Sequence, residues 1–139
     1  MAPEAAAEDY IKQLQKQAVN AARWPRLDWV LMGMGADGHT ASLFPGQVHP
    51  AEADSPVVAV TASYQGRPTN RVTLTPLVFN AAENVLFLVT GASKAAVLAE
   101  VLQGAHDPLQ LPAQRIQPLT GSLAWFMDTA AAALIKKES

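Results

Sequence analysis

The chain has 139 residues, half of them hydrophobic, which is enough for one domain with a hydrophobic core. Its formal net charge of −2 argues against binding to nucleic acid or to an anionic membrane surface, and the absence of cysteine excludes disulfides and thiolate metal sites. Residues 1–7 do not resemble a secretory signal, and no apolar run approaches the roughly 18 residues of a membrane span, so we expect a soluble, cytoplasmic domain.

The first half of the chain is predicted to contain two helical segments and three strands. Apolar residues at helical spacing indicate an amphipathic helix that Pro25 closes, and a buried strand follows it. We expect His49 to be exposed in a surface loop. The predicted elements are helix 5–22, strand 27–32, a helical turn at 41–44, loop 47–55, strand 57–60, turn 64–70 and strand 71–75.

The second half is predicted to continue the alternation of helices and strands. Pro76 suits the first turn of a short helix, and Gly104 suits the end of a longer one. The predicted elements are helix 77–82, strand 84–89, a helix to about residue 102, loop 108–112, strand 115–119 and a helix from residues 121–122 to 135. We expect Leu123, Trp125 and Phe126 to be core residues. The alternation favours a mixed α/β fold with a mostly parallel sheet.

Residues 33–46 (GMGADGHTASLFPG) are the strongest candidate for a functional site. They follow a buried strand, where α/β sheets place their ligands, and glycines allow sharp turns and close approach to a ligand. Histidine has an ordinary pKa of about 6.5, which suits it to accept a proton near neutral pH, and a nearby carboxylate orients the ring. Asp37 and His39 are therefore candidate catalytic residues. In isolation, this pair is more often a capping Asp and a structural loop His.

Two cationic side chains are candidates for binding an anion. Lys94 follows the Thr90-Gly91 turn between a strand and a helix, where free backbone N–H groups attract anions. Arg71 opens a predicted strand and has the bidentate geometry that suits an anion. The alternative for both is a solvated surface charge. His106 is read as a surface residue, and Asp128 as a structural one.

Several segments together resemble the 6-phosphogluconolactonase family. Residues 33–46 are similar to its signature, and the resemblance extends over nearly the whole chain. The other matching segments are 68–75 (PTNRVTLT), 91–94 (GASK), 111–113 (LPA) and 125–128 (WFMD). The resemblance implies a Rossmann-like three-layer sandwich with a mostly parallel sheet, shared with glucosamine-6-phosphate deaminases and ribose-5-phosphate isomerases.

The resemblance also implies an activity and a role for each residue. The activity is hydrolysis of 6-phospho-D-glucono-1,5-lactone in the pentose phosphate pathway, with no cofactor and no metal. His39 would be the general base that activates water, Asp37 would orient it, and Arg71 and Lys94 would hold the 6-phosphate. From the geometry of such loops, the N–H groups around Gly33, Gly35 and Gly38 are expected to steady the oxyanion.

The chain departs from the family pattern in two respects. The related deaminases continue the motif toward Asn-Glu-Pro, whereas residues 43–45 are Leu-Phe-Pro, and Phe44 cannot carry a proton. Only the C-terminal portion of the family is matched, so its N-terminal phosphate loop and first strands are not found. We expect an exposed sheet edge or face that a homodimer or a separate N-terminal segment covers. The alternatives to a lactonase are a non-catalytic fragment that binds sugar phosphate and a deaminase-type isomerase.

Overall fold

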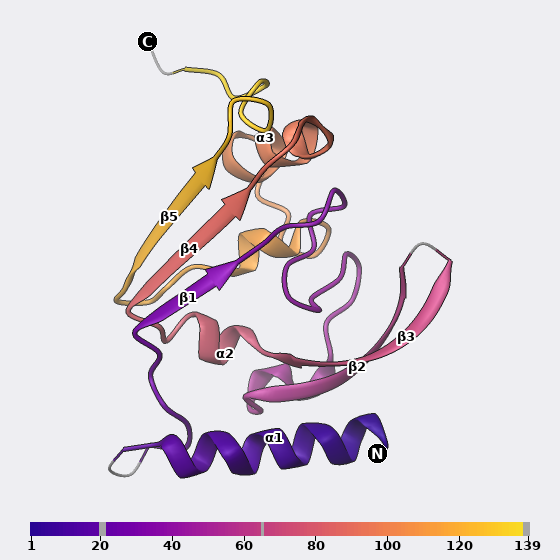
Figure 1. Ribbon diagram of the computed structural model, residues 1–139, viewed down its shortest axis with the longest axis vertical. Coiled ribbons are helices and arrows are strands. Elements are labelled where there is room, and N and C mark those ends of the chain that lie inside the picture. Colours follow the sequence, from indigo (N-terminus) through magenta and orange to yellow (C-terminus); the bar gives the residue numbers. More distant parts are fainter. Residues whose placement is uncertain (20–21, 65, 138–139) are drawn as a thin grey trace.

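A three-stranded parallel sheet and a separate two-stranded hairpin form the framework of the computed structural model, which describes residues 1–19, 22–64 and 66–137 (Figure 1). The sheet has the order β1 (Trp29–Met32), β4 (Asn84–Val89), β5 (Ser122–Met127). Both strand pairs are parallel, and Leu86 of β4 is in register with Leu31 on one side and Ala124 on the other. This confirms the mixed α/β fold with a mostly parallel sheet.

Helical segments cover one face of this sheet. Side chains from alternate positions of β1 and β4, such as Met32 and Phe87, are buried there with Leu98 of α3 (Ala95–Gln103) and with Ile116. The Trp125 ring of β5 stacks on Phe87, with ring centroids 3.9 Å apart and planes inclined by 5°. The other helical segments along the chain are α2 (Pro76–Phe79) and the 3₁₀ helices η1 (Pro50–Ala53), η2 (Ala92–Lys94) and η3 (Pro112–Arg115).

The opposite face of the sheet is apolar and exposed. Trp29 and Leu31 of β1 are 65% and 66% exposed, Leu88 of β4 is 50% exposed and Phe126 of β5 is 61% exposed. The expectation that Phe126 belongs to the core is therefore wrong, and Leu123 is also only partly covered. Parallel sheets are ordinarily buried on both faces. Within the described ranges, these side chains have no such cover.

The hairpin forms a second, smaller unit with the N-terminal helix (Figure 1). Strand β2 (Val57–Tyr64) pairs antiparallel with β3 (Arg67–Leu74), and α1 (Pro3–Gln17) packs on it through Ala7 and Leu14. The predicted turn over residues 64–70 is wrong for most of its length, because strand pairing continues to the tip of the hairpin. Gly66, with φ of +73°, lies at that tip, and Gln65 lies outside the described residues.

Three further predicted elements also differ from the structure. The first helix ends at Gln17, because Ala18 is already extended, and does not reach residue 22; residues 20–21 lie outside the described part. Residues 41–44 form a tight turn closed by the Thr40–Leu43 bridge rather than a helical turn. Residues 115–119 contain the end of η3 and irregular chain, not a strand.

The predicted C-terminal helix is wrong over its whole described length. Residues 122–127 form β5, and only turns follow it up to residue 134. Gly121 does not cap a helix. A Cβ there would lie 2.3 Å from the Ala82 carbonyl oxygen and 2.5 Å from that of Glu83, so glycine lets the chain pass against this backbone as it enters β5.

His49 also has a structural role that the sequence did not indicate. It caps η1: its Nδ1 accepts the Ala51 N–H at 3.1 Å, and its own N–H donates to Glu52 Oε1 at 2.9 Å. The buried Glu52 forms an ion pair with Arg115, which links η1 to η3.

His106 is exposed in a loop, as expected. In the described part of the chain, no helix is both long and apolar enough to cross a membrane.

Candidate active site

The glycine-rich loop leaves the end of β1 and is closed upon itself by hydrogen bonds. The Gly35 N–H donates to the His39 carbonyl at 2.9 Å, and the Thr40 hydroxyl donates to the Gly33 carbonyl at 2.7 Å. Gly38 has φ of +86°, a conformation that favours glycine, and its carbonyl accepts the Ala113 N–H of η3 at 3.0 Å. The loop is therefore held in one conformation between β1 and η3.

Asp37 and His39 form a hydrogen-bonded pair inside this loop. Asp37 Oδ1 lies 2.6 Å from His39 Nδ1 and also accepts the His39 backbone N–H at 3.0 Å. Partial burial acts to raise the pKa of Asp37, but the hydrogen bonds and the attraction from His39 outweigh it, so the pKa lies below its ordinary value. A charged Asp37 orients the imidazole and stabilises it when it takes up a proton.

Gly35 leaves room for this pair. A Cβ at position 35 would lie 2.2 Å from both Nδ1 and Cε1 of His39 and 2.8 Å from Asp37 Oδ1. Any side chain there would overlap the imidazole ring. The sequence indicated Gly35 as a ligand-binding residue, and the structure adds a steric reason for it: the His39 ring lies where a Cβ would be.

Arg71 reaches the loop from the hairpin rather than from the parallel sheet. It lies within β3, opposite Val60, and so does not open a strand as predicted. Its guanidinium carbon lies 5.8 Å from the centre of the Phe44 ring, and its Nε donates to the Thr69 hydroxyl at 3.3 Å. The Phe44 ring also packs against His39, with ring centroids 5.0 Å apart. The hairpin thus places a cation close to the Asp37–His39 pair.

Lys94 approaches from the end of β4, at the last residue of η2. Its ammonium group donates a hydrogen bond to the Met34 carbonyl of the glycine-rich loop. The Gly91 N–H, which the sequence suggested for anion binding, instead donates to the Asp128 carboxylate at 3.1 and 3.2 Å. Hydrogen bonds from Ala131 N–H and from Gly91 N–H lower the pKa of Asp128. Asp128 is therefore structural, as expected.

These side chains converge on one cavity of about 380 Å³. Its lining consists of Gly33, Met34, Gly35, His39, Thr40, Ala41, Arg71 and Lys94. Asp37 and Gly38 do not line the cavity. Asp37 acts through its hydrogen bond to His39, and Gly38 provides the positive φ that the turn requires. A histidine with its carboxylate and two cations around one cavity can abstract a proton from water beside a bound anion.

The sequence did not single out Met34, Thr40 or Ala41 as lining residues. Ala41 adopts φ of +50°, which is unusual for a residue other than glycine, and no sequence signal predicts it. The position of Thr40 next to His39 in the motif was a signal that could have indicated its role. Its buried hydroxyl fixes the loop through Gly33.

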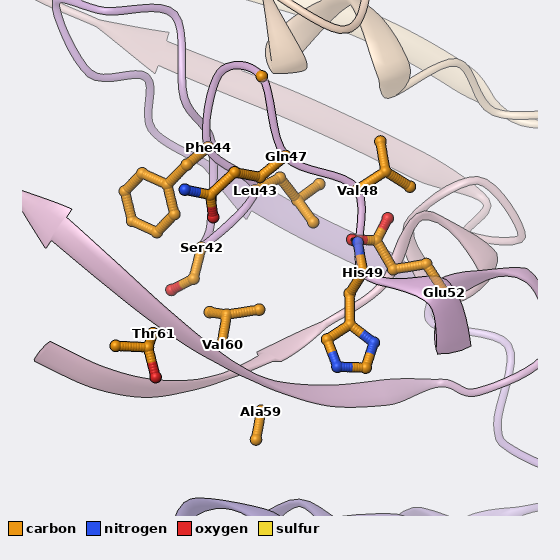
Figure 2. A pocket seen from close by; sticks show the side chains of 11 residues that line it. Ser42, Leu43, Phe44, Gln47, Val48, His49, Glu52, Ala59, Val60 and Thr61 are labelled. Carbon is orange, nitrogen blue, oxygen red and sulfur yellow. The ribbon is translucent and has the colours of Figure 1, made fainter.

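A second cavity of about 330 Å³ lies beside the first, between residues 42–52 and β2. Figure 2 shows the Phe44 ring at one end of this cavity and His49 and Glu52 at the other.

Among the residues that the structure describes, no group of three or more His, Cys, Asp or Glu side chains is placed to hold a metal ion.

Comparison with known proteins identifies the family. A family model described as glucosamine-6-phosphate isomerases/6-phosphogluconolactonase matches residues 1–125. The chain is 46% identical over 133 residues to a 6-phosphogluconolactonase of Rattus norvegicus, covering 95% of this chain and 50% of that protein.

Solved structures agree with this match. A crystal structure of devB protein superposes with a TM-score of 0.86 at 36% identity, covering 98% of this chain and 56% of that one. The 6-phosphogluconolactonase of Trypanosoma brucei superposes with a TM-score of 0.75 at 31% identity, covering 93% and 52%. The chain spans about half the length of the curated relatives it matches. It belongs to the glucosamine-6-phosphate isomerase/6-phosphogluconolactonase family.

Proposed function

We propose that this chain carries the catalytic centre for hydrolysis of 6-phospho-D-glucono-1,5-lactone to 6-phosphogluconate, a reaction of the pentose phosphate pathway. The observation that supports it most directly is the 2.6 Å contact between Asp37 and His39 beside a cavity that Arg71 and Lys94 also line. The relatives named 6-phosphogluconolactonase support the same substrate. A cytoplasmic location stays a prediction from the sequence.

In the proposed reaction, His39 acts as the general base. Nδ1 is engaged by Asp37, so Nε2 is the atom that takes a proton from water while the water oxygen attacks the lactone carbonyl carbon. The negative charge passes to the carbonyl oxygen, which backbone N–H groups of the loop near Gly33 are proposed to stabilise. The Gly35 and Gly38 N–H groups are left out of this role, because they donate to the His39 carbonyl at 2.9 Å and to the Gly35 carbonyl at 3.0 Å. The ring C–O bond then breaks, and the imidazolium returns the proton to the departing oxygen. No cofactor or metal enters this scheme.

Arg71 and Lys94 are proposed to hold the 6-phosphate of the substrate. They approach the cavity from the hairpin and from the sheet respectively, so an anion between them would bridge the two units of the fold. Lys94 has three donors, and its bond to Met34 uses one of them. This arrangement fixes the phosphate at one end of the cavity and the carbonyl near His39.

Phe44 favours hydrolysis over the deaminase alternative. It is buried against the His39 ring, and an aromatic hydrocarbon cannot transfer the proton that the corresponding Glu of the deaminases carries. A glucosamine-6-phosphate assay separates the two reactions. The third reading, a fragment that binds sugar phosphate without turnover, predicts binding of 6-phosphogluconate and no acceleration of lactone hydrolysis.

The decisive experiment compares lactone hydrolysis with the spontaneous rate. We expect the chain to accelerate hydrolysis and His39→Ala to lower kcat by about 10²- to 10⁴-fold, the range for loss of a general base. His106→Ala is the matched control, because His106 is an exposed loop residue outside the cavity, and it should retain wild-type activity. Equal rates with and without the wild-type chain contradict the proposal.

We also infer that another polypeptide covers the open face of the sheet, either a second copy of this chain or a separate N-terminal segment. The support is the row of exposed apolar side chains at Trp29, Leu31, Leu88 and Phe126. An apolar surface of this kind marks an interaction site on an otherwise polar protein.

A further inference from the structure

Phe44 contacts two of the groups that the proposed reaction depends on. Its ring centroid is 5.0 Å from that of His39, with the planes inclined by 31°, and 5.8 Å from the guanidinium carbon of Arg71. The side chain is 7% exposed, so it has little freedom to move. One rigid ring therefore contacts both the proposed base and a proposed phosphate ligand.

The chemistry of an aromatic ring suits this position. The face of the ring carries partial negative charge and attracts the Arg71 guanidinium, which otherwise has a long, flexible side chain. The same ring supports one side of the imidazole, while Asp37 fixes its Nδ1 edge. An aliphatic side chain would fill space but would provide neither a flat surface nor this attraction.

Phe44 also lines a cavity other than that of the proposed active site. It lines the 330 Å³ cavity that Figure 2 shows, whereas its neighbours His39 and Arg71 line the 380 Å³ cavity of the proposed active site. Loss of the ring would enlarge the 330 Å³ cavity and give the imidazole and the guanidinium space to reorient.

We propose that Phe44 is a positioning residue that fixes the spacing between the general base and the phosphate ligand. The inference rests on the proposed function and extends it, because it makes one side chain responsible for both proton abstraction and phosphate placement. Phe44 touches no reacting atom in this scheme; it acts through His39 and Arg71. Its loss should therefore affect kcat and KM together.

The test is Phe44→Met, which conserves most of the volume and removes the aromatic face. We expect kcat to fall about tenfold or more and KM to rise, since a misplacement of about 1 Å typically costs up to 10² in rate. Phe44→Tyr keeps the ring and should restore activity to near wild type. Phe79→Met is the matched control: Phe79 is equally buried, at 5% exposure, and lies in the core away from the cavity.

A second measurement does not depend on turnover. The Phe44 ring current shifts the NMR signals of the His39 ring protons and the Arg71 Nε–H, and Phe44→Met should move both sets while Phe79→Met moves neither. If Phe44→Met is not folded, as judged by the absence of a cooperative urea transition, Phe44→Leu is used in its place. Absence of lactonase activity in the wild type refutes the proposed function, and the NMR shifts then decide the positioning role alone. Kinetics of Phe44→Met equal to those of Phe79→Met, or unshifted signals, overturn the inference.

Discussion

Gly35→Ala tests whether the position of the His39 ring determines catalysis. The Gly35 backbone does not have a positive φ, so alanine can adopt it, and the effect is confined to the added methyl group. That methyl would lie 2.2 Å from two atoms of the imidazole. To restore an ordinary contact of 3.4 Å, the ring must move by about 1.2 Å.

A movement of this size should break the 2.6 Å hydrogen bond between His39 and Asp37 and misalign the base. A misplacement of about 1 Å costs up to about 10² in rate, so we expect kcat for lactone hydrolysis to fall by about 10²-fold. We expect a loss no larger than that of His39→Ala, because the methyl group would meet only the imidazole and the Asp37 carboxylate that supports it.

A double-mutant cycle makes this test specific. In the His39→Ala background, the imidazole that the methyl group would displace is gone, so Gly35→Ala should cost little further activity. Gly33→Ala is the control for displacement of the His39 ring, because a Cβ at position 33 would meet no atom within 4 Å. In this variant the NMR signals of His39 should stay at their wild-type positions. Wild-type kcat in Gly35→Ala, or an equal loss in both backgrounds, refutes the reasoning.

Three further changes test the site, the fold and the open face. Asp37→Asn should lower kcat at least about tenfold, because the imidazole loses the carboxylate that orients it. The pKa of Asp37 in the folded protein lies below its ordinary value of 3.8, so the stabilisation that Asp37 contributes is present above pH 3.8 and is lost as the pH falls through the folded pKa. Urea titrations at pH 6 in which the wild type is no more stable than Asp37→Asn contradict this. Gly121→Ala places a methyl group 2.3 Å from the Ala82 carbonyl oxygen and should lower the free energy of unfolding by about 1–3 kcal/mol; an unchanged urea midpoint argues against that crowding. Light scattering after size exclusion should show association of the wild type that Leu31→Glu weakens, and a stable wild-type monomer at micromolar concentration rules out the homodimer.

Local signals in the sequence were sufficient where an element's own residues determine it. The strand Asn84–Val89 was predicted with its observed bounds, and the helix after it ends before Gly104, as predicted. The glycine-rich loop with Asp37 and His39 was recognised for the same reason, since a turn and a hydrogen bond between residues two apart are local interactions.

Tertiary structure decided the elements whose hydrogen bonds are made far along the chain. Residues 122–127 were predicted as helix, but their backbone pairs with Asn84–Val89, and no local pattern contains that pairing. The site was decided in the same way. His39 follows β1, Arg71 lies on the hairpin and Lys94 follows β4, and each was a candidate by its own chemistry. The sequence by itself determined the reactive groups and the family they resemble. Only packing of the hairpin against the sheet loops determined that Arg71 lies against Phe44, which also contacts His39, because Arg71 and Phe44 are far apart in the sequence and no local interaction joins them.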